Sequence, residues 1–491
     1  TDCLTQTTRL LKKSKTGPAI VINRRGLTLG ENEHMGNGAT VALVPDQRVR
    51  HMHLVGASGT GKSTLLLNLI KQDLENGQGI AVLDPHGDLI DRILDMVPEN
   101  RINEVILVDP ADEEFSVGFN FLAAHSELEK DLLASDLVSV FQRLSTSWGD
   151  QMTAVLGNAV CAILESSSGG TLLDLRRFLV QQDFRTSFLR SVRDEEVVYF
   201  WEREFPLLAG KPQAPLLTRL NTFLRPKRIR YMVGQKKGRL NFANIMDTGK
   251  IFLAKLSQGE IGEENAFLLG TLLVSKFHQM AISRQRLHES QRRDFWFYID
   301  ECHNFITPSM ASLLSGVRKY RLGLILAHQE LRQLKRNAEV ASAVLTNPFT
   351  RICFRIGDED ARTLAAGFSF FEASDLQNLS VGEAICRVER ADYDFNLRVP
   401  PVSFVESHLA RAKRERIIAR SRTQFATPVD VVEREISRSR DSDAQANGIP
   451  FRDKPGVITV DGKTSGHPDS LQRRANPEDS ATSKSTVQAA G

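Results

Sequence analysis

The 491-residue sequence contains few cysteines, no long apolar run and almost no net charge. The five cysteines form no CxxC pair, which argues against a disulfide framework or a zinc module and favours a reducing compartment. They are Cys3, Cys161, Cys302, Cys353 and Cys386. The most apolar run, 266–274, is shorter than the roughly 18 residues that a membrane-spanning helix needs. A formal charge of +3 excludes a histone-like polycation, so any contact with nucleic acid must come from a local patch.

The length allows two or three domains, and the hydrophobic content of 41% and charged content of 25% are ordinary for a globular protein. Short alternating segments punctuated by Gly and Pro predict a small β-rich segment at residues 1–45. Residues 46–125 and 246–404 carry strand–loop–helix–strand patterns and predict two parts of one α/β core with a parallel sheet. Apolar residues at three-and-four spacing predict an all-α insertion at 126–245. The polar segment 405–491 is expected to be a largely disordered tail.

The stretch "GASGTGKS" satisfies the phosphate-loop pattern and lies between an apolar strand and an apolar helix. Glycines let backbone N–H groups turn inward around phosphate oxygens, and the start of a helix adds partial positive charge. Lys62 would reach the β- and γ-phosphates of ATP, and Ser63 would offer its hydroxyl to Mg²⁺. The predicted nucleotide-binding residues are Gly56, Ala57, Ser58, Gly59, Thr60, Gly61, Lys62, Ser63 and Thr64.

A second motif, "FWFYIDECH", places two acids at the end of a continuous apolar run. Such a run predicts a buried parallel strand, and ligands of open α/β sheets gather at the carboxyl ends of the strands. Asp300 is the predicted metal ligand, and Glu301 is the predicted base that orients and deprotonates the attacking water. Cys302 and His303 have no second ligand pair at matching spacing, so a structural role is favoured for His303.

Two further polar residues end strand-like runs. Gln329, after "LGLILAH", is predicted to sense the γ-phosphate or to position the water, the alternative being a polar residue that faces solvent. Asp84, after "GIAVL", either belongs to the surroundings of the site or begins the "DPHGD" turn. The two readings of Asp84 stay open at this point.

The succession of "RHMHLVGASGTGKSTLLLNLI", "GIAVLDPHGDL", "FWFYIDECHNF" and "VRKYRLGLILAHQ" resembles the HerA/FtsK superfamily of ATPases. Within it, the resemblance is to conjugative coupling proteins of type IV secretion systems, of the TraG/TraD kind, and covers roughly residues 25–400. The resemblance implies a RecA-like P-loop NTPase core with an inserted all-α domain. It also implies a homo-hexameric ring that hydrolyses ATP to translocate DNA, with a relaxase or secretion-channel proteins as further partners.

Carried over by position, Lys62 is a catalytic residue of this motor, together with Glu301 and Gln329. Arg318 matches the arginine that, in such rings, reaches the neighbouring subunit's γ-phosphate, with Arg351 and Arg355 as competitors. Coupling proteins usually carry N-terminal membrane helices, and this chain starts at Thr1 without them. We therefore expect a cytoplasmic protein, held at the inner membrane only if an anchor precedes that residue.

Two basic stretches, 225–239 and 411–422, either track nucleic-acid phosphates independently of base sequence or are ordinary solvated surfaces. Two other functions remain open beside the DNA motor. One is an adaptor ATPase that recruits and threads a protein, and the other is a nucleotide-switched scaffold in a defence or DNA-processing complex.

Overall fold

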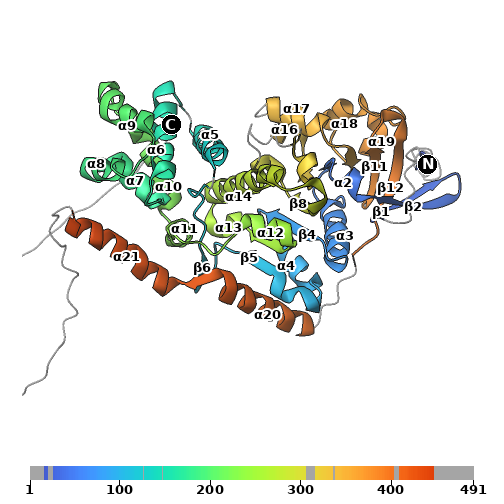
Figure 1. Ribbon diagram of the computed structural model, residues 1–491. Coiled ribbons are helices and arrows are strands. Elements are labelled where there is room, and N and C mark those ends of the chain that lie inside the picture. Colours follow the sequence, from blue (N-terminus) through green and yellow to red (C-terminus); the bar gives the residue numbers. More distant parts are fainter. Residues whose placement is uncertain are drawn as a thin grey trace, which may run out of the picture. The chain divides into compact units, whose positions relative to one another are not determined.

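The computed structural model describes residues 16–19, 26–124, 126–145, 147–305, 314, 316–334, 338–402 and 408–446. In these residues the main sheet has the strand order β2-β1-β12-β11-β10-β3-β9-β8-β4-β7-β5 (Figure 1). The strands are β1 (Leu27–His34), β2 (Asn37–Leu43), β3 (Met52–Val55), β4 (Gly79–Asp84), β5 (Val105–Val108), β7 (Ile251–Lys255), β8 (Phe295–Ile299), β9 (Leu322–His328), β10 (Thr350–Cys353), β11 (Glu383–Val388) and β12 (Asp394–Arg398). A second, two-stranded sheet pairs β6 (Phe115–Val117) with β13 (Ala426–Pro428).

The strands from β10 to β5 pair in parallel, whereas β11, β12, β1 and β2 extend the sheet antiparallel at one edge. Every residue of β3, β8 and β9 is buried, as the continuous apolar runs predicted for strands covered on both faces. The predicted α/β class is confirmed. At the N-terminal side, Glu31 of β1 pairs with Arg398 of β12, so β1 and β2 extend this sheet.

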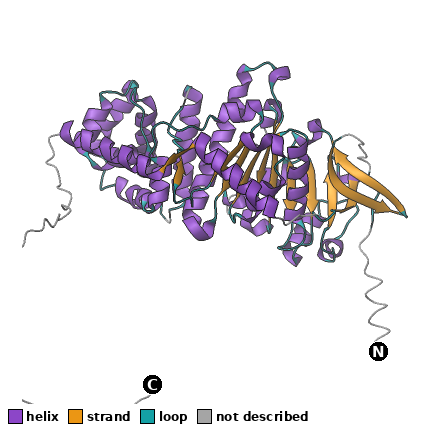
Figure 2. Cartoon of the chain, turned by 90° about the horizontal axis from the view of Figure 1, so that it is seen from below, coloured by secondary structure: helices purple, strands orange, loops and turns teal. Residues whose placement is uncertain are grey.

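Helices pack against the strands of this sheet (Figure 2). Those of the sheet core are α2 (Pro45–Arg48), α3 (Lys62–Glu75), α4 (Asp88–Met96), α13 (Gln258–Ile261), α14 (Glu263–Ser283), α16 (Leu331–Leu334), α17 (Ala338–Thr346), α18 (Asp358–Ala365) and α19 (Ala373–Gln377). Between β6 and β7 the chain is helical. This helical part contains α5 (Glu127–Arg143), α6 (Asp150–Glu165), α7 (Leu172–Val180), α8 (Gln182–Leu189), α9 (Glu195–Tyr199), α10 (Gln213–Leu224), α11 (Lys227–Val233) and α12 (Phe242–Thr248).

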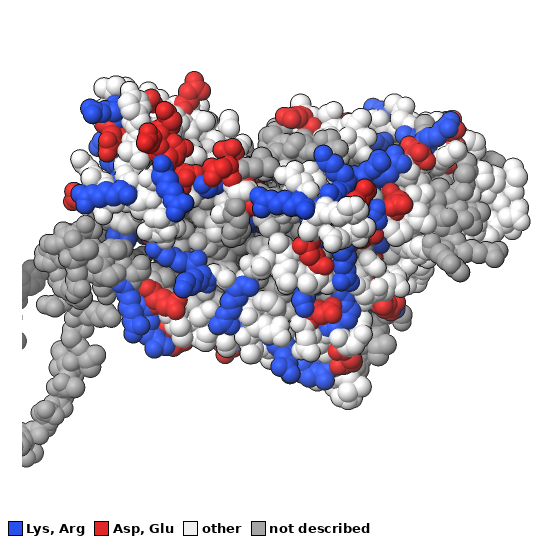
Figure 3. All heavy atoms as spheres, viewed as in Figure 1, with Lys and Arg blue, Asp and Glu red and all other residues white. Residues whose placement is uncertain are grey.

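The polar segment after residue 405 contains more regular structure than its composition predicts. Helices α20 (His408–Phe425) and α21 (Val429–Ala446) flank β13. The basic residues of α20 contact acids of the sheet core: Arg414 binds Asp95 at 2.7 Å, and Arg422 binds Asp112 at 2.8 Å. On the face shown in Figure 3, Lys and Arg side chains are correspondingly interspersed with Asp and Glu. The stretch 411–422 is therefore neither a free arm nor a merely solvated helix, because its charges help to dock α20.

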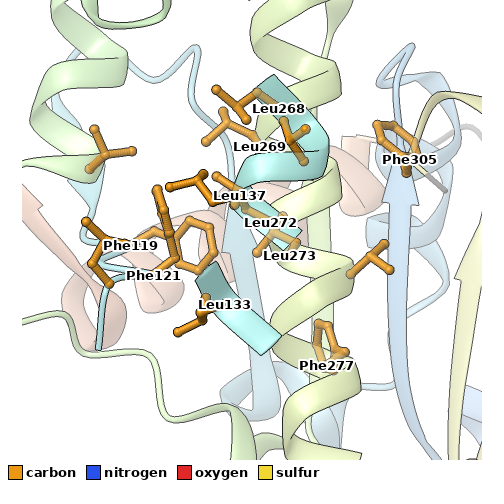
Figure 4. Packing of buried hydrophobic residues seen from close by; sticks show 14 of the residues in the cluster. Phe119, Phe121, Leu133, Leu137, Leu268, Leu269, Leu272, Leu273, Phe277 and Phe305 are labelled. Atoms are coloured by element: carbon orange, nitrogen blue, oxygen red, sulfur yellow. The ribbon is translucent and has the colours of Figure 1, made fainter. Parts of the chain in front are cut away.

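Helix α14 joins the sheet to the helical part through one continuous apolar core. Figure 4 shows side chains that meet there: Phe119, Phe121, Leu133, Leu137, Leu268, Leu269, Leu272 and Leu273. The stretch Glu263–Arg286 is long and apolar enough to cross a membrane, but 89% of its apolar 18-residue segment is buried inside the protein. Because it is buried on both sides, α14 is a core helix that holds the two parts together. Truncating one of these leucines to alanine would therefore lower the free energy of unfolding by about 2–5 kcal/mol.

A buried ion pair connects α2 and α3 to the sheet. Arg48 of α2 donates to both carboxylate oxygens of Asp73 in α3, at 2.8 and 2.7 Å, and lies 3.7 Å from the Trp296 ring centroid. The hydroxyl of Tyr298, in β8, donates to Asp73 at 2.5 Å. The Arg48–Asp73–Tyr298 network thus fixes the phosphate-loop helix against the strand that carries Asp300.

Candidate active site

The phosphate loop connects β3 to α3, and its glycines are required by backbone shape. Gly59 has φ 73°, and Gly61, the residue before α3, has φ 125°, where a side chain is strained. A Cβ on Gly61 would also lie 3.0 Å from Phe354 and 3.2 Å from Gly382. A glycine-rich loop that leads directly into the start of a helix is a common binding site for anions.

Lys62, the first residue of α3, folds back over this loop. Its Nζ donates to the carbonyl oxygens of Gly56, at 2.5 Å, and Ala57, at 3.1 Å. Burial lowers the pKa of Lys62, while the charges of Glu301 and Asp300 oppose that shift. The lysine and the two acids thus share one electrostatic environment, although they lie on different elements of the sheet.

Asp300 and Glu301 follow β8, which is separated from β3 by β9 alone. Burial, and after it the neighbouring charges of Glu301 and Asp84, together raise the pKa of Asp300 to about 7. Glu301 has φ 45° and ψ 50°, a left-handed conformation that costs on the order of 1–3 kcal/mol in a non-glycine residue. This tight turn brings two carboxylates to one place at the carboxyl edge of the sheet.

Glu301 is buried and held by side chains from two segments. The Nε2 of Gln329, directly after β9, donates to Glu301 Oε1 at 2.6 Å. The Nδ1 of His303 lies 3.4 Å from Glu301 Oε2. Gln329 therefore faces the acids and not solvent. His303, for which the sequence favoured a structural role, lies beside the predicted base Glu301. The sequence signal for this was that His303 follows Glu301 by two residues in the turn after the strand.

Asp84 serves the turn that follows β4. Its carboxylate accepts hydrogen bonds from the backbone N–H groups of His86, Leu89 and Ile90 at 2.9–3.1 Å. The same charge raises the pKa of Asp300. Both readings left open by the sequence hold, since one carboxylate orders the start of α4 and also bears on the site.

The residues present fit a magnesium ion. Ser63 is exposed in the first turn of α3, so its hydroxyl is accessible. Asp300 supplies a partly buried carboxylate, whose Oδ1 accepts a hydrogen bond from the backbone N–H of Glu301 at 3.0 Å. No group of three or more His, Cys, Asp or Glu in the described parts of the chain forms a complete metal cage. Mg²⁺ needs none, because it takes one or two protein oxygens and completes its shell with water and substrate phosphates.

The three candidate arginine fingers lie in different places. Arg318 is exposed in the short turn Val317–Tyr320, before β9, at the amino edge of the sheet. The seven residues of β9 span about 23 Å, so Arg318 is far from the loop of its own subunit. Arg351 is partly buried in β10 and donates to the Leu345 carbonyl. Arg355 is exposed, and its carbonyl accepts from Ala57 N–H of the phosphate loop at 2.8 Å.

Comparison with known families gives one match. The family described as "Type IV secretion-system coupling protein DNA-binding domain" matches residues 36–384. No curated protein matches the chain.

Solved structures share the fold at low sequence identity. The plasmid coupling protein TrwB in complex with a non-hydrolysable ATP analogue is 17% identical, with a TM-score of 0.58 over 79% of this chain and 92% of that one. TrwB in complex with ADP and Mg²⁺ is 16% identical, with a TM-score of 0.57 over the same shares. VirB4 of Thermoanaerobacter pseudethanolicus is 15% identical, with a TM-score of 0.53 over 79% of this chain and 99% of that one.

Proposed function

The chain belongs to the type IV secretion-system coupling proteins, the TraG/TraD-like ATPases of the HerA/FtsK superfamily, and we propose that it hydrolyses ATP in a homo-hexameric ring to move DNA. The observation that carries the proposal is the convergence of Lys62 with Asp300 and Glu301, since both acids raise the pKa of Lys62 and the lysine lowers that of Asp300. A loop that only bound nucleotide would not need a buried base held by an amide. A cytoplasmic position, at the inner membrane only if an anchor precedes Thr1, belongs to the same proposal.

The protein's own groups divide the work of hydrolysis. The amides of the loop bind the phosphates, and Lys62 exchanges the carbonyls of Gly56 and Ala57 for β- and γ-phosphate oxygens. Ser63 and Asp300 would hold Mg²⁺, which supplies neutralisation of the phosphate charge. Glu301 accepts the proton of the attacking water, and Gln329 keeps its carboxylate aimed at that water.

Arg318 would complete the site of the neighbouring subunit. Its exposure and its distance from its own phosphate loop suit a group that acts in trans, where it stabilises transition-state charge. Hydrolysis by the Arg318→Ala variant should therefore fall, and mixed rings of Arg318→Ala with Lys62→Ala should recover part of it. Normal turnover by Arg318→Ala alone would refute this assignment and direct attention to Arg355.

The proposed DNA contact lies in the second half of the stretch 225–239. The first half is occupied within the molecule, since Arg228 pairs with Glu113 and Arg230 donates to the Leu224 carbonyl. Lys236 and Lys237 are exposed and line a groove of about 500 Å³ between α7 and α21. Further basic residues of this groove are Arg176, Arg177 and Arg239. Such a surface would hold phosphates without reading bases.

The experiment is ATP turnover by wild type and Lys62→Ala, with and without single- and double-stranded DNA. We expect turnover that DNA stimulates and that Lys62→Ala abolishes. Stimulation by a protein partner but not by DNA would instead support the adaptor that threads protein. Exposed apolar side chains of the helical part, Val180, Tyr199 and Leu207, favour that second candidate.

The groove has a matched test. Lys236→Glu combined with Lys237→Glu should weaken binding of a fluorescent DNA duplex about tenfold or more, and lower the salt slope by about 1.8. The control is Arg411→Glu with Arg420→Glu, an equal charge change on exposed residues of α20. Equal losses in both double variants would show that net charge alone, and not the groove, determines binding.

A further inference from the structure

Two buried histidines lie between the phosphate loop and Gln329. His53 belongs to β3, three residues before Gly56, and His328 is the last residue of β9, directly before Gln329. Both side chains are 0% exposed. Their Nε2 atoms are 2.7 Å apart, and the rings are nearly parallel, at 15°. This contact links the strand that leads into the loop to the strand that directly precedes Gln329.

The hydrogen bonds fix the direction of this link. His328 Nδ1 lies 3.1 Å from the carbonyl oxygen of Glu330, which can only accept, so Nδ1 carries the hydrogen. Burial lowers the pKa of His328 to about 3 and that of His53 well below its ordinary value, so both rings are neutral. A neutral His328 then has a bare Nε2, and the hydrogen in the shared bond belongs to Nε2 of His53. The chain of donors runs from His53 through His328 to the Glu330 carbonyl.

This chain brackets Gln329. His328 forms one hydrogen bond with His53 of β3 and another with the backbone carbonyl of Glu330. Gln329 lies between His328 and Glu330, so both of its neighbours in the chain are fixed. Gln329 in turn holds Glu301 at 2.6 Å. A shift of about 1 Å at a catalytic group can cost about a hundredfold in rate.

We propose that His53 and His328 are positioning residues for ATP hydrolysis: their hydrogen bond sets Gln329, and through it Glu301, relative to the phosphate loop. The proposal rests on the proposed ATPase function. The pair touches neither phosphates nor water, and it acts only through Gln329. Losing it therefore lowers kcat and leaves nucleotide binding intact.

The test compares His53 of β3 with His51, which directly precedes the same strand. His53→Leu removes the donor, and we expect kcat to fall about tenfold or more with KM for ATP unchanged. His53→Gln, whose amide can donate from nearly the same place, should stay within about threefold of wild type. The control is His51→Leu, because His51 Nδ1 also accepts a hydrogen bond across β3 and β9, from Leu324 N–H at 3.1 Å, away from Gln329. It should lower stability and leave kcat at the wild-type value.

The double variant His53→Leu with His328→Leu guards against simple misfolding. Replacing both partners leaves neither imidazole unpaired, so the variant should fold and show the same low kcat as His53→Leu. Full kcat in His53→Leu, or an equal loss in His51→Leu, would overturn the positioning role. ATP turnover by wild type and by Lys62→Ala is measured in the same experiment. If wild type is no faster than Lys62→Ala, the proposed function is refuted, and the inference with it. If wild type is active and His53→Leu keeps full kcat, only the role of the histidines is refuted.

Discussion

Two buried charged clusters lie against the same sheet, and they are built on opposite principles. In the Arg48–Asp73–Tyr298 network, both carboxylate oxygens of Asp73 receive hydrogen bonds, and burial of the Arg48 charge is offset by Asp73, which raises the pKa of Arg48. At the carboxyl edge, Asp300 and Glu301 have like charges as neighbours. Within the described residues, Glu301 Oε2 receives no hydrogen bond, although His303 Nδ1 lies 3.4 Å from it.

This difference indicates that the Arg48–Asp73–Tyr298 network is structural and that Asp300 and Glu301 form a ligand-binding site. A buried carboxylate with all its partners is stable as it stands, because the partners replace the water it has lost. A buried carboxylate that lacks them raises its pKa or binds a cation. Burial alone therefore does not identify a functional site, whereas like charges held side by side at the carboxyl edge of the sheet favour one.

The largest effect should come from changing the two acids at the carboxyl edge, Asp300 and Glu301. Glu301→Gln removes the proton acceptor, and we expect kcat for ATP to fall about 10²–10⁴-fold while a fluorescent ATP analogue still binds. Asp300→Asn should lose activity to a similar extent, and should also need more Mg²⁺. Tyr298→Phe, in the satisfied network, should keep wild-type kcat. If Tyr298→Phe instead lost as much activity as Glu301→Gln, the two clusters would not differ in the way argued above.

The next largest effect is on stability, and here the Arg48–Asp73–Tyr298 network should be more sensitive than the two acids. Asp73→Ala strands the buried charge of Arg48, which is 6% exposed, and should lower the free energy of unfolding by about 3–5 kcal/mol. Tyr298→Phe removes one hydrogen bond to the same carboxylate and should cost about 1–3 kcal/mol. Urea denaturation measures both. A loss below about 1 kcal/mol in Asp73→Ala would mean that the network does not carry the attachment of α3.

The third prediction concerns pH and has a definite sign. In the folded protein the pKa of Asp300 is about 7, raised first by burial, against an ordinary value of 3.8. Between these values the folded state binds more protons than the unfolded state, so this residue makes unfolding easier as pH rises. Without nucleotide and in EDTA, Asp300→Asn should match wild type in stability near pH 4 and exceed it by on the order of 2–4 kcal/mol at pH 8. An advantage that was the same at both pH values would contradict the raised pKa.

The sequence predicted the loop and both acids because each is a local pattern. "GASGTGKS" and "FWFYID" each combine a buried strand with residues of fixed chemistry. Since parallel strands end at one edge of a sheet, the convergence of Lys62 with Asp300 followed from the strand assignments alone. The confirmed α/β class rests on the same periodicity.

What the sequence could not predict depends on partners distant along the chain. The basic residues of 411–422 give no sign that Asp95 and Asp112, some three hundred residues earlier, lie opposite them. The contact of His53 with His328 spans 275 positions and has no motif. The joining of β1 to β12 is likewise a tertiary pairing that alternation cannot reveal.

The smallest expected effect tests a third kind of charge pair, at the surface. Arg422 is 30% exposed and binds Asp112, which is 14% exposed, with two nitrogens at 2.8 and 2.9 Å. Because solvent and salt screen such a pair, Arg422→Ala should cost only about 1 kcal/mol or less, and less still in 0.5 M salt. Arg411→Ala is the control, since Arg411 is 85% exposed and pairs only within its own helix in the described structure. Arg411→Ala should not measurably lower the free energy of unfolding. The contributions of the three Arg–carboxylate pairs to stability should then follow their burial, with Arg48 largest, Arg422 next and Arg411 smallest. Equal costs at Arg48 and Arg422 would show that docking of α20, and not depth in the sheet, dominates the stability of this protein.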